Sequence, residues 1–309
     1  DLLKTGTSTR SRKQISDELD KIKTDISFSG FPNGLTINVN TDKKNLAAAL
    51  ALLDDLLRNP KFDAAEFDKA VLDAKASTEA NMSDPQTIVS EKLSKLTTNY
   101  PKGHPSYASS SAEQLEELAK TSLDDVKNFY KDFYGANNSI SAFVGELDKN
   151  TITGFLNKTF GTWDSKMKFT AIAPKHFDVK GGTEAINTPD KTNAVVLGNI
   201  NINISETHKD YPALFMANEL LGGGAFLSSR IPMRLRENEG MSYGAGTYMN
   251  SNYKYDVTNW GLYAIFNPLY KGRLDSAMHQ EIDKAIAAGF TKDELTKSVS
   301  AWIEGNKTS

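Results

Sequence analysis

Apolar residues recur at three- and four-residue spacing in several stretches of the chain, which is the pattern of helices that bury one side. The clearest examples are 46–57 and 274–288. Further helices are expected at 8–22, 64–80, 86–97, 111–119, 151–160, 210–221 and 226–237, with another that opens at Ser122. Hydroxyl residues at the start of 8–22 and at Ser122 are typical helix caps.

Alternating apolar and polar residues predict strands between these helices. They are expected at 25–28, 35–40, 193–204, 242–250 and 257–266, and a strand of the buried type is expected at 139–144. The turn sequence Phe31-Pro32-Asn33-Gly34 joins the first two strands into a hairpin. Hairpin-like strand pairs beside long helices favour an α+β fold with antiparallel sheets over a doubly wound parallel sheet.

The chain contains an internal repeat. Residues 62–71 resemble residues 290–299, with Phe, Glu, Lys and Val at the same spacing and an offset of 228 residues (Phe290 against Phe62). Each copy follows one of the two clearest helices, and Asp1-Leu2-Leu3 matches Glu219-Leu220-Leu221 at an offset of 218. Two unrelated amphipathic helices can look alike by chance, but the ordered series of elements favours a duplication.

The repeat predicts two homologous domains, at 1–163 and 183–309, joined by a lysine-rich linker at 164–182. The two offsets differ by ten, so the second copy has about ten additional residues between the two matched segments. The first copy continues well past the matched helix, whereas the second has strand-like sequence ahead of it. The first domain is therefore expected to lack its N-terminal part and the second its C-terminal part, as in a piece of a longer protein.

Composition excludes several classes of function. The net charge of −3, from 36 basic and 39 acidic residues, gives no reason to expect nucleic acid or an anionic membrane as partner. The absence of cysteine excludes disulfides, thiol catalysis and a cysteine-based zinc site. No apolar run reaches the roughly 18 residues of a membrane span. The compartment stays open, with a bacterial periplasm favoured over the cytoplasm.

The most informative stretch comprises Leu220–Gly224, Ser228–Arg230 and Leu235–Tyr243. It resembles the insulinase/pitrilysin superfamily of zinc peptidases, and specifically the C-terminal half that lacks the metal. Shorter pieces that resemble the same family are Asn59–Phe62, Asp84–Pro85, Gly103–Tyr107, Asn137–Gly145 and Phe160–Trp163. Together they cover nearly the whole chain in the family's order.

The resemblance implies two domains like those of the mitochondrial processing peptidase. It implies a catalytic half, in the same chain or a separate subunit, whose His-x-x-Glu-His motif and distant Glu hold zinc for peptide hydrolysis. The half without metal closes a chamber around the peptide. There an Arg and a Tyr seven residues apart bind the substrate backbone, and the matching pair is Arg236 and Tyr243.

The chemistry of this pair suits a peptide substrate. A guanidinium and a phenol both donate hydrogen bonds, which suits the carbonyl oxygens of an extended peptide and the negative charge that develops during hydrolysis. The alternative is an ordinary surface Arg and a half-buried sheet Tyr. Without the surrounding motif, that alternative would be favoured.

Zinc is not expected in this chain, and neither is a catalytic residue. None of the four histidines lies in a His-x-x-Glu-His motif, and His279-Gln280-Glu281-Ile282-Asp283 lacks the second His. By alignment with the family motif, Asp1 falls at or near the place of the second His, shortly before Gly6-Thr7. Glu79, a candidate for the distant Glu, has no His partners.

The histidines are instead predicted in structural settings: His104 in a turn, His176 solvated in the linker, His208 in a loop and His279 on the solvated face of a helix. Gly222-Gly223-Gly224 fits neither a P-loop nor a dinucleotide fingerprint and predicts a flexible turn.

Three functions remain open. The chain is the substrate-binding half of a zinc metalloendopeptidase, a catalytically dead scaffold subunit of the same superfamily, or a stand-alone peptide-binding module. The presence of both Arg236 and Tyr243 favours the first, because a scaffold needs no substrate clamp.

Overall fold

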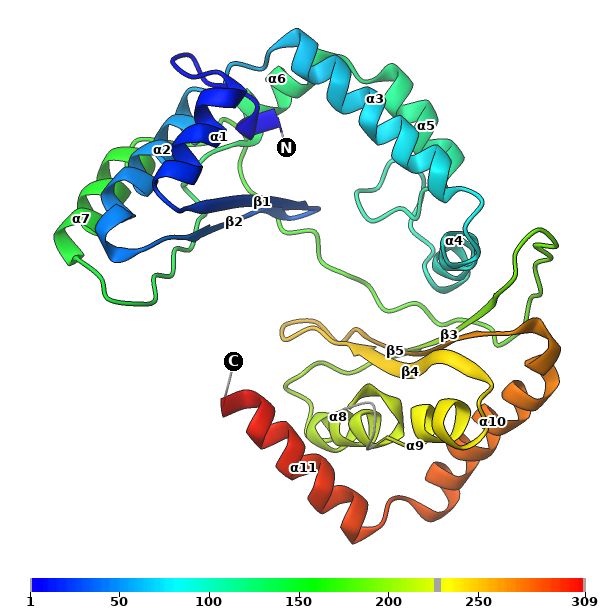
Figure 1. Cartoon of the computed structure of the whole chain (residues 1–309). Helices are drawn as coiled ribbons and strands as arrows, with labels where there is room; N and C mark the ends of the chain where they lie inside the picture. The colour runs from blue at the N-terminus through cyan, green and yellow to red at the C-terminus, as the bar shows by residue number, and fades with distance from the viewer. Residues whose placement is uncertain (1, 225–228, 308–309) are drawn as a thin grey trace. The chain divides into compact units, whose positions relative to one another are not determined.

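The computed structural model describes residues 2–224 and 229–307, and the chain forms two compact units (Figure 1). The first unit consists of residues 1–80 and 111–172, and the second of 81–110 and 173–309. The units are therefore interleaved along the sequence. They differ from the ranges 1–163 and 183–309 expected from the repeat in where residues 81–110 belong.

The first unit packs helices against a two-stranded antiparallel sheet. Strands β1 (Asp25–Phe31) and β2 (Gly34–Asn40) pair from Asp25 opposite Asn40 to Phe31 opposite Gly34. The helices are η1 (Leu2–Lys4), α1 (Arg12–Lys21), η2 (Lys43–Asn45), α2 (Leu46–Arg58), α3 (Ala64–Asn81), α5 (Ser111–Lys120), α6 (Leu123–Phe133), α7 (Lys149–Phe155) and η3 (Leu156–Phe160). Its core is built on fully buried Ile15, Ile26, Leu52 and Leu56.

The second unit contains a three-stranded antiparallel sheet in the order β3 (Ala194–Ile202), β5 (Thr258–Phe266), β4 (Ser242–Asn250). Its helices are α4 (Pro85–Thr97), α8 (Tyr211–Asn218), η4 (Glu219–Gly223), α9 (Arg230–Pro232), η5 (Met233–Asn238), η6 (Pro268–Tyr270), α10 (Lys271–Ala288) and α11 (Lys292–Lys307). Figure 1 shows α8, α9 and α10 beneath one face of the sheet. The core there includes buried Ile231, Leu235, Ala264 and Leu274.

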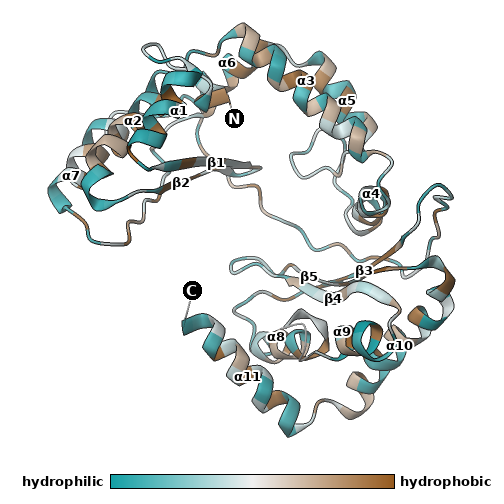
Figure 2. Ribbon diagram, viewed as in Figure 1, coloured by the Kyte–Doolittle hydropathy of each residue, from teal (hydrophilic) through white to brown (hydrophobic). Residues whose placement is uncertain are grey.

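The helices have the surface pattern and the end signals that the sequence indicated. Figure 2 shows hydrophilic and hydrophobic residues interleaved along α10 and α11, as in helices with one side facing solvent. Ser11 caps α1 and Ser122 caps α6, each in a reciprocal capping box. None of the helices in the described residues is long and apolar enough to cross a bilayer.

The segment 81–110 belongs to the second unit because it packs on β3. Asn201 on β3 donates to the carbonyl oxygens of Thr97 and Phe177, each at 2.9 Å. The hydroxyl of Tyr100 accepts from the Lys175 amide at 2.9 Å, and the Tyr100 ring stacks on His104. Residues 173–178 of the expected linker therefore lie against this loop.

The expected α+β fold with antiparallel sheets packed by helices is confirmed, but two local predictions are wrong. Residues 139–144 form no strand, and Ile140 and Val144 are 100% and 97% exposed. Their composition is that of a buried strand, but no described strand pairs with them, and such a segment is stable as a strand only within a sheet. Gly222 and Gly223 lie in the π-helical turn η4 and not in a flexible loop.

Close packing explains the glycines of η4. A Cβ on Gly222 would lie 2.7 Å from the amide nitrogen of Thr247 on β4, and one on Gly223 would lie 2.1 Å from the side chain of Asn218. The backbone of this turn therefore approaches the strand more closely than any larger residue permits. The neighbouring position Ser228, part of the family resemblance, lies outside the described residues, as does Asp1.

The two units repeat one another in detail, which supports the duplication. Helices α2 and α3 match α10 and α11, and the hairpin β1–β2 matches β4–β5. Arg12 pairs with Glu66 at 2.8 Å, and Arg230 pairs with Glu294 at 2.6 Å, at the same 218- and 228-residue offsets. The added residues of the second copy lie largely in its hairpin, whose connection spans 251–257 where the first has two residues.

Candidate functional site

Arg236 lies in the π-helical turn η5, directly before a sharp reversal of the chain. Gly240 has a φ of +59° and donates its amide to the Arg236 carbonyl at 3.1 Å, a conformation that favours glycine. The amide of Met241 then donates to the Leu235 carbonyl at 2.8 Å, and the Met241 side chain is buried. This reversal ends the helix and leads into β4.

An ion-pair cluster holds the back of this reversal. Arg234 donates to Glu239 at 2.9 Å and to the largely buried Glu281 on α10 at 3.0 Å. Arg273 approaches the other oxygen of Glu239 at 3.3 Å. The hydrogen bond from Arg234 lowers the pKa of Glu239 despite some desolvation. The turn is thus anchored to α10 through residues that flank Arg236.

The Arg236 side chain itself is about half exposed. Its guanidinium lies 3.8 Å from the neighbouring Glu237, and side-chain exposures are 50% and 43%. The opposite side of the same turn carries buried Leu235 and, one turn earlier, Ile231. Arg236 therefore lies on the solvent side of a helix whose other side is fixed in the core.

Tyr243 lies at a β-bulge near the start of β4. In the pairing with β5, Ser242 lies opposite Phe266 and Gly244 lies opposite Ile265, so Tyr243 is the extra residue. Its side chain is 66% exposed, whereas Ser242 is 7% exposed. Such bulges redirect a side chain and are common beside binding sites.

The two predicted site residues thus lie at the two ends of one braced reversal, and both are exposed. Sequence reasoning missed the residues that brace it, namely Ser242, Arg234 and Glu239. No motif marks them, because their roles come from a bulge and from contacts with α10.

The histidines do not form a metal site. His104 accepts from the Ser106 amide at 3.0 Å, which confirms its predicted role in a turn. His208 in a loop and His279 on the exposed side of α10 are also as predicted. The prediction of a solvated His176 is wrong: its side chain is only 20% exposed and its Nδ1 is buried, while its Nε2 lies 3.2 Å from the exposed Asp178.

The described residues offer no cluster of side chains that fits zinc. Over residues 2–224 and 229–307, no three His, Cys, Asp or Glu side chains lie close enough together to hold a metal ion. No step that requires zinc is therefore assigned to these residues.

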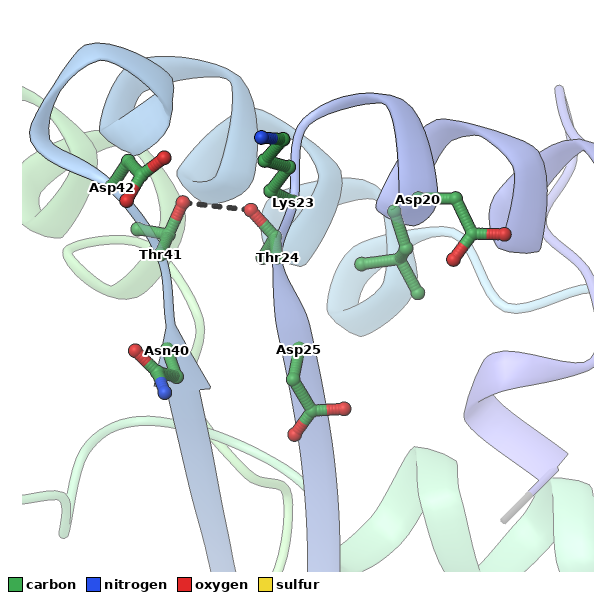
Figure 3. A pocket seen from close by; sticks show the side chains of 8 residues that line it. Asp20, Lys23, Thr24, Asp25, Asn40, Thr41 and Asp42 are labelled. Atoms are coloured by element: carbon green, nitrogen blue, oxygen red, sulfur yellow. Dashed lines mark hydrogen bonds between the residues drawn. The ribbon is translucent and has the colours of Figure 1, made fainter.

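A polar hollow of about 450 Å³ lies in the first unit (Figure 3). It is lined by Leu19, Asp20, Lys23, Thr24, Asp25, Asn40, Thr41 and Asp42. Thr24 and Thr41 hydrogen-bond across it at 2.7 Å.

At the 218-residue offset, Glu18 and Asp25 occupy the places of Arg236 and Tyr243. The first unit therefore has carboxylates where the second has hydrogen-bond donors.

Comparisons with known families match most of the chain. Residues 120–301 match the family profile described as "Peptidase M16 inactive domain", which is more than half of the chain. Residues 2–109 match the profile "Insulinase (Peptidase family M16)".

Two curated relatives are named as uncharacterized zinc proteases. One, YmxG of Bacillus subtilis, is 24% identical over 95% of this chain and 68% of its own length. The other, from Rickettsia felis, is 25% identical over 94% of this chain and 65% of its own length. The chain thus spans about two thirds of the length of these relatives.

A solved structure shares the fold. The crystal structure of a peptidase M16 inactive domain from Pseudomonas fluorescens superposes with a TM-score of 0.84 and 18% identity. The match covers 100% of this chain and 73% of the other.

Proposed function

This chain belongs to the insulinase family of peptidases, M16, and we propose that it is the substrate-binding half of a zinc metalloendopeptidase. The zinc and the catalytic motif His-x-x-Glu-His belong to a separate half, joined to this one in the same chain or as another subunit. The two halves enclose a peptide or unfolded polypeptide in a chamber. Here Arg236 and Tyr243 hold the main chain of the substrate.

The observation that carries this proposal is the braced reversal that exposes both donors. The Arg236 side chain is 50% exposed and Tyr243 is 66% exposed, although the backbone under them is fixed by Gly240, Met241 and the Arg234 cluster. Rigid support lowers the entropy lost when the donors engage a ligand. Exposed donors on a fixed backbone suit repeated carbonyl oxygens of an extended peptide.

The first unit supports the same assignment by contrast. At the corresponding places it has Glu18, already paired with Arg10 at 2.8 Å, and Asp25. Carboxylates are acceptors and repel carbonyl oxygens. At these two pairs of positions, the second copy therefore has donors suited to a peptide backbone and the first has acceptors.

The test uses the assembled peptidase that contains this chain and the half with His-x-x-Glu-His. Arg236→Ala and Tyr243→Phe are each expected to lower kcat/KM for a fluorogenic oligopeptide by about tenfold, the cost of losing a hydrogen bond to a charged or developing oxyanion. Their melting temperatures should match the unmodified protein, because both side chains are exposed.

The controls are residues of equal exposure outside the reversal. Tyr253, 73% exposed, replaced by Phe, and Arg12, whose side chain is 54% exposed, replaced by Ala, should leave kcat/KM unchanged. Unchanged activity in both site variants would remove their role. If metal analysis found tightly bound zinc in this chain alone, it would contradict the assignment of zinc to the other half.

A further inference from the structure

The β-bulge at Tyr243 is held by one buried hydroxyl. The Oγ of Ser242 lies 2.8 Å from the Gly244 carbonyl and 2.9 Å from the Ile265 carbonyl on β5, and it accepts from the Gly244 amide at 3.1 Å. A single O–H donates to one of these carbonyls at a time. The hydroxyl thus links the two ends of the bulge to the neighbouring strand.

The surroundings of Ser242 make this arrangement unusual. Its neighbours Met241 and Phe266 are 2% and 4% exposed, so the position lies among apolar side chains. An apolar residue would pack there at no cost in desolvation, whereas a buried hydroxyl needs hydrogen bonds to offset its burial. Ser242 finds those bonds on the backbone of the bulge.

We infer that Ser242 is a positioning residue for Tyr243: its hydroxyl fixes the β-bulge that directs the Tyr243 phenol toward a bound peptide. This inference rests on the proposed function of Tyr243. Without the hydroxyl, the Gly244 amide and the Ile265 carbonyl each lose a partner at the point where the register shifts. The bulge can then relax, and Tyr243 leaves its fixed direction.

The first measurement is independent of peptide binding. In protein labelled with 3-fluorotyrosine, the Tyr243→Phe variant identifies the ¹⁹F resonance of Tyr243 among the 11 tyrosines. Ser242→Ala is expected to shift or broaden that resonance, and Ser242→Thr, which keeps a hydroxyl, is expected to restore it. An unchanged resonance in Ser242→Ala would overturn the inference, whatever the fate of the proposed function.

The second measurement is a double-mutant cycle on the affinity of the 309-residue chain for fluorescein-labelled β-casein, an unfolded polypeptide. Ser242→Ala is expected to weaken binding roughly fivefold, the cost of a lost hydrogen bond. In a Tyr243→Ala background it should cause no further loss, because the two residues act through one contact. Additive losses would show that Ser242 acts apart from Tyr243 and would overturn the inference.

A matched control comes from the same strand. Thr247 on β4 also has a buried hydroxyl, which donates to the Asn218 carbonyl at 3.3 Å, away from the bulge. Thr247→Val should lower stability but leave both the ¹⁹F resonance and casein binding unchanged. If Tyr243→Ala does not weaken casein binding, the proposed function fails at that step, and the resonance alone decides the inference.

Discussion

At the scale of single residues, the ion pair between Arg230 and Glu294 is a largely buried charged contact in the second unit. The Nε and Nη2 atoms of Arg230 donate to Glu294 at 2.6 and 2.9 Å, and the guanidinium also lies over the Phe290 ring. Arg230 is only 10% exposed and Glu294 28% exposed. Its hydrogen bond to Glu294 is the main reason that the pKa of this carboxyl falls to about 2. A bidentate, largely buried pair of this kind is stronger than a surface pair.

This pair predicts a pH dependence of stability. A carboxyl with a lowered folded pKa stabilises the fold above its unfolded pKa, and the effect is lost as the pH falls toward 2. The unmodified chain is expected to have a higher free energy of unfolding than Glu294→Gln, and this difference should fall by about 2 kcal/mol when the pH is lowered from 6 to 3. The size of the fall follows from the lowering of the Glu294 pKa from 4.5 to about 2. Urea unfolding at several pH values measures the difference.

The repeat supplies the control for this prediction. Glu66→Gln removes the corresponding pair with Arg12, whose side chain is 54% exposed. Exposed pairs contribute less than about 1 kcal/mol, so the free energy of unfolding of this variant should stay within about 1 kcal/mol of that of the unmodified chain. If the gap for Glu294→Gln stays constant with pH, the Arg230 pair does not stabilise the fold.

At the scale of elements, the sheet of the second unit depends on a glycine in β5. A Cβ on Gly261 would lie 2.2 Å from the Tyr248 ring on β4 and 2.7 Å from the Gly198 carbonyl on β3. The ring therefore occupies the space above this glycine. Because a backbone carbonyl cannot move aside as a flexible side chain can, any larger residue must distort the pairing of the strands.

Gly261→Ala is expected to lower the free energy of unfolding by about 1–3 kcal/mol through overpacking. Gly154→Ala is the matched change in a helix: nothing lies within 4 Å of the added methyl group in α7. Gly154→Ala should raise the free energy of unfolding by roughly 0.5–1 kcal/mol, because alanine gives the unfolded chain less conformational entropy than glycine does. Urea titrations of both variants check the two signs, and an equal effect in both would contradict the steric account.

Elements with a clear period could be predicted from the sequence, and those that depend on a neighbouring backbone could not. The strands at 194–202 and 242–250 could be predicted from their sequence pattern, and Val196 and Ala245 on them pack with the core of the second unit. Residues 139–144 have the composition of a buried strand but lack a described partner strand. The π-helical turn η4 could not be predicted from a hydrophobic period, because Gly222 is required there by the close approach of β4.

The candidate site also has residues that could be predicted from the sequence and residues that could not. Arg236 and Tyr243 could be named because their spacing resembles a family motif. Their support could not, because the contact of Arg234 with Glu281 spans 47 residues and the bulge at Tyr243 depends on pairing with β5. The first depends on tertiary packing, and the second on a register that alternation alone does not fix.

At the scale of the whole molecule, the chain has two separate cores although its units are interleaved in sequence. Leu52 on α2 lies fully buried in the first core, and Leu274 on α10 lies in the second at 1% exposure. Helix α4 lies between α3 and α5 in the sequence but belongs to the second unit with β3. Local stability should follow these units and not the order of the chain.

Hydrogen exchange with two matched variants tests this arrangement. Leu52→Ala and Leu274→Ala should each cost about 2–5 kcal/mol in their own core. Leu274→Ala is expected to speed amide exchange in α4, β3 and α10 and to leave α1 and β1 unchanged, whereas Leu52→Ala should do the reverse. Faster exchange of α4 in Leu52→Ala alone would assign that helix to the first unit. The braced reversal that carries Arg236 should respond only to Leu274→Ala, because its anchors Glu281 and Arg273 lie on α10.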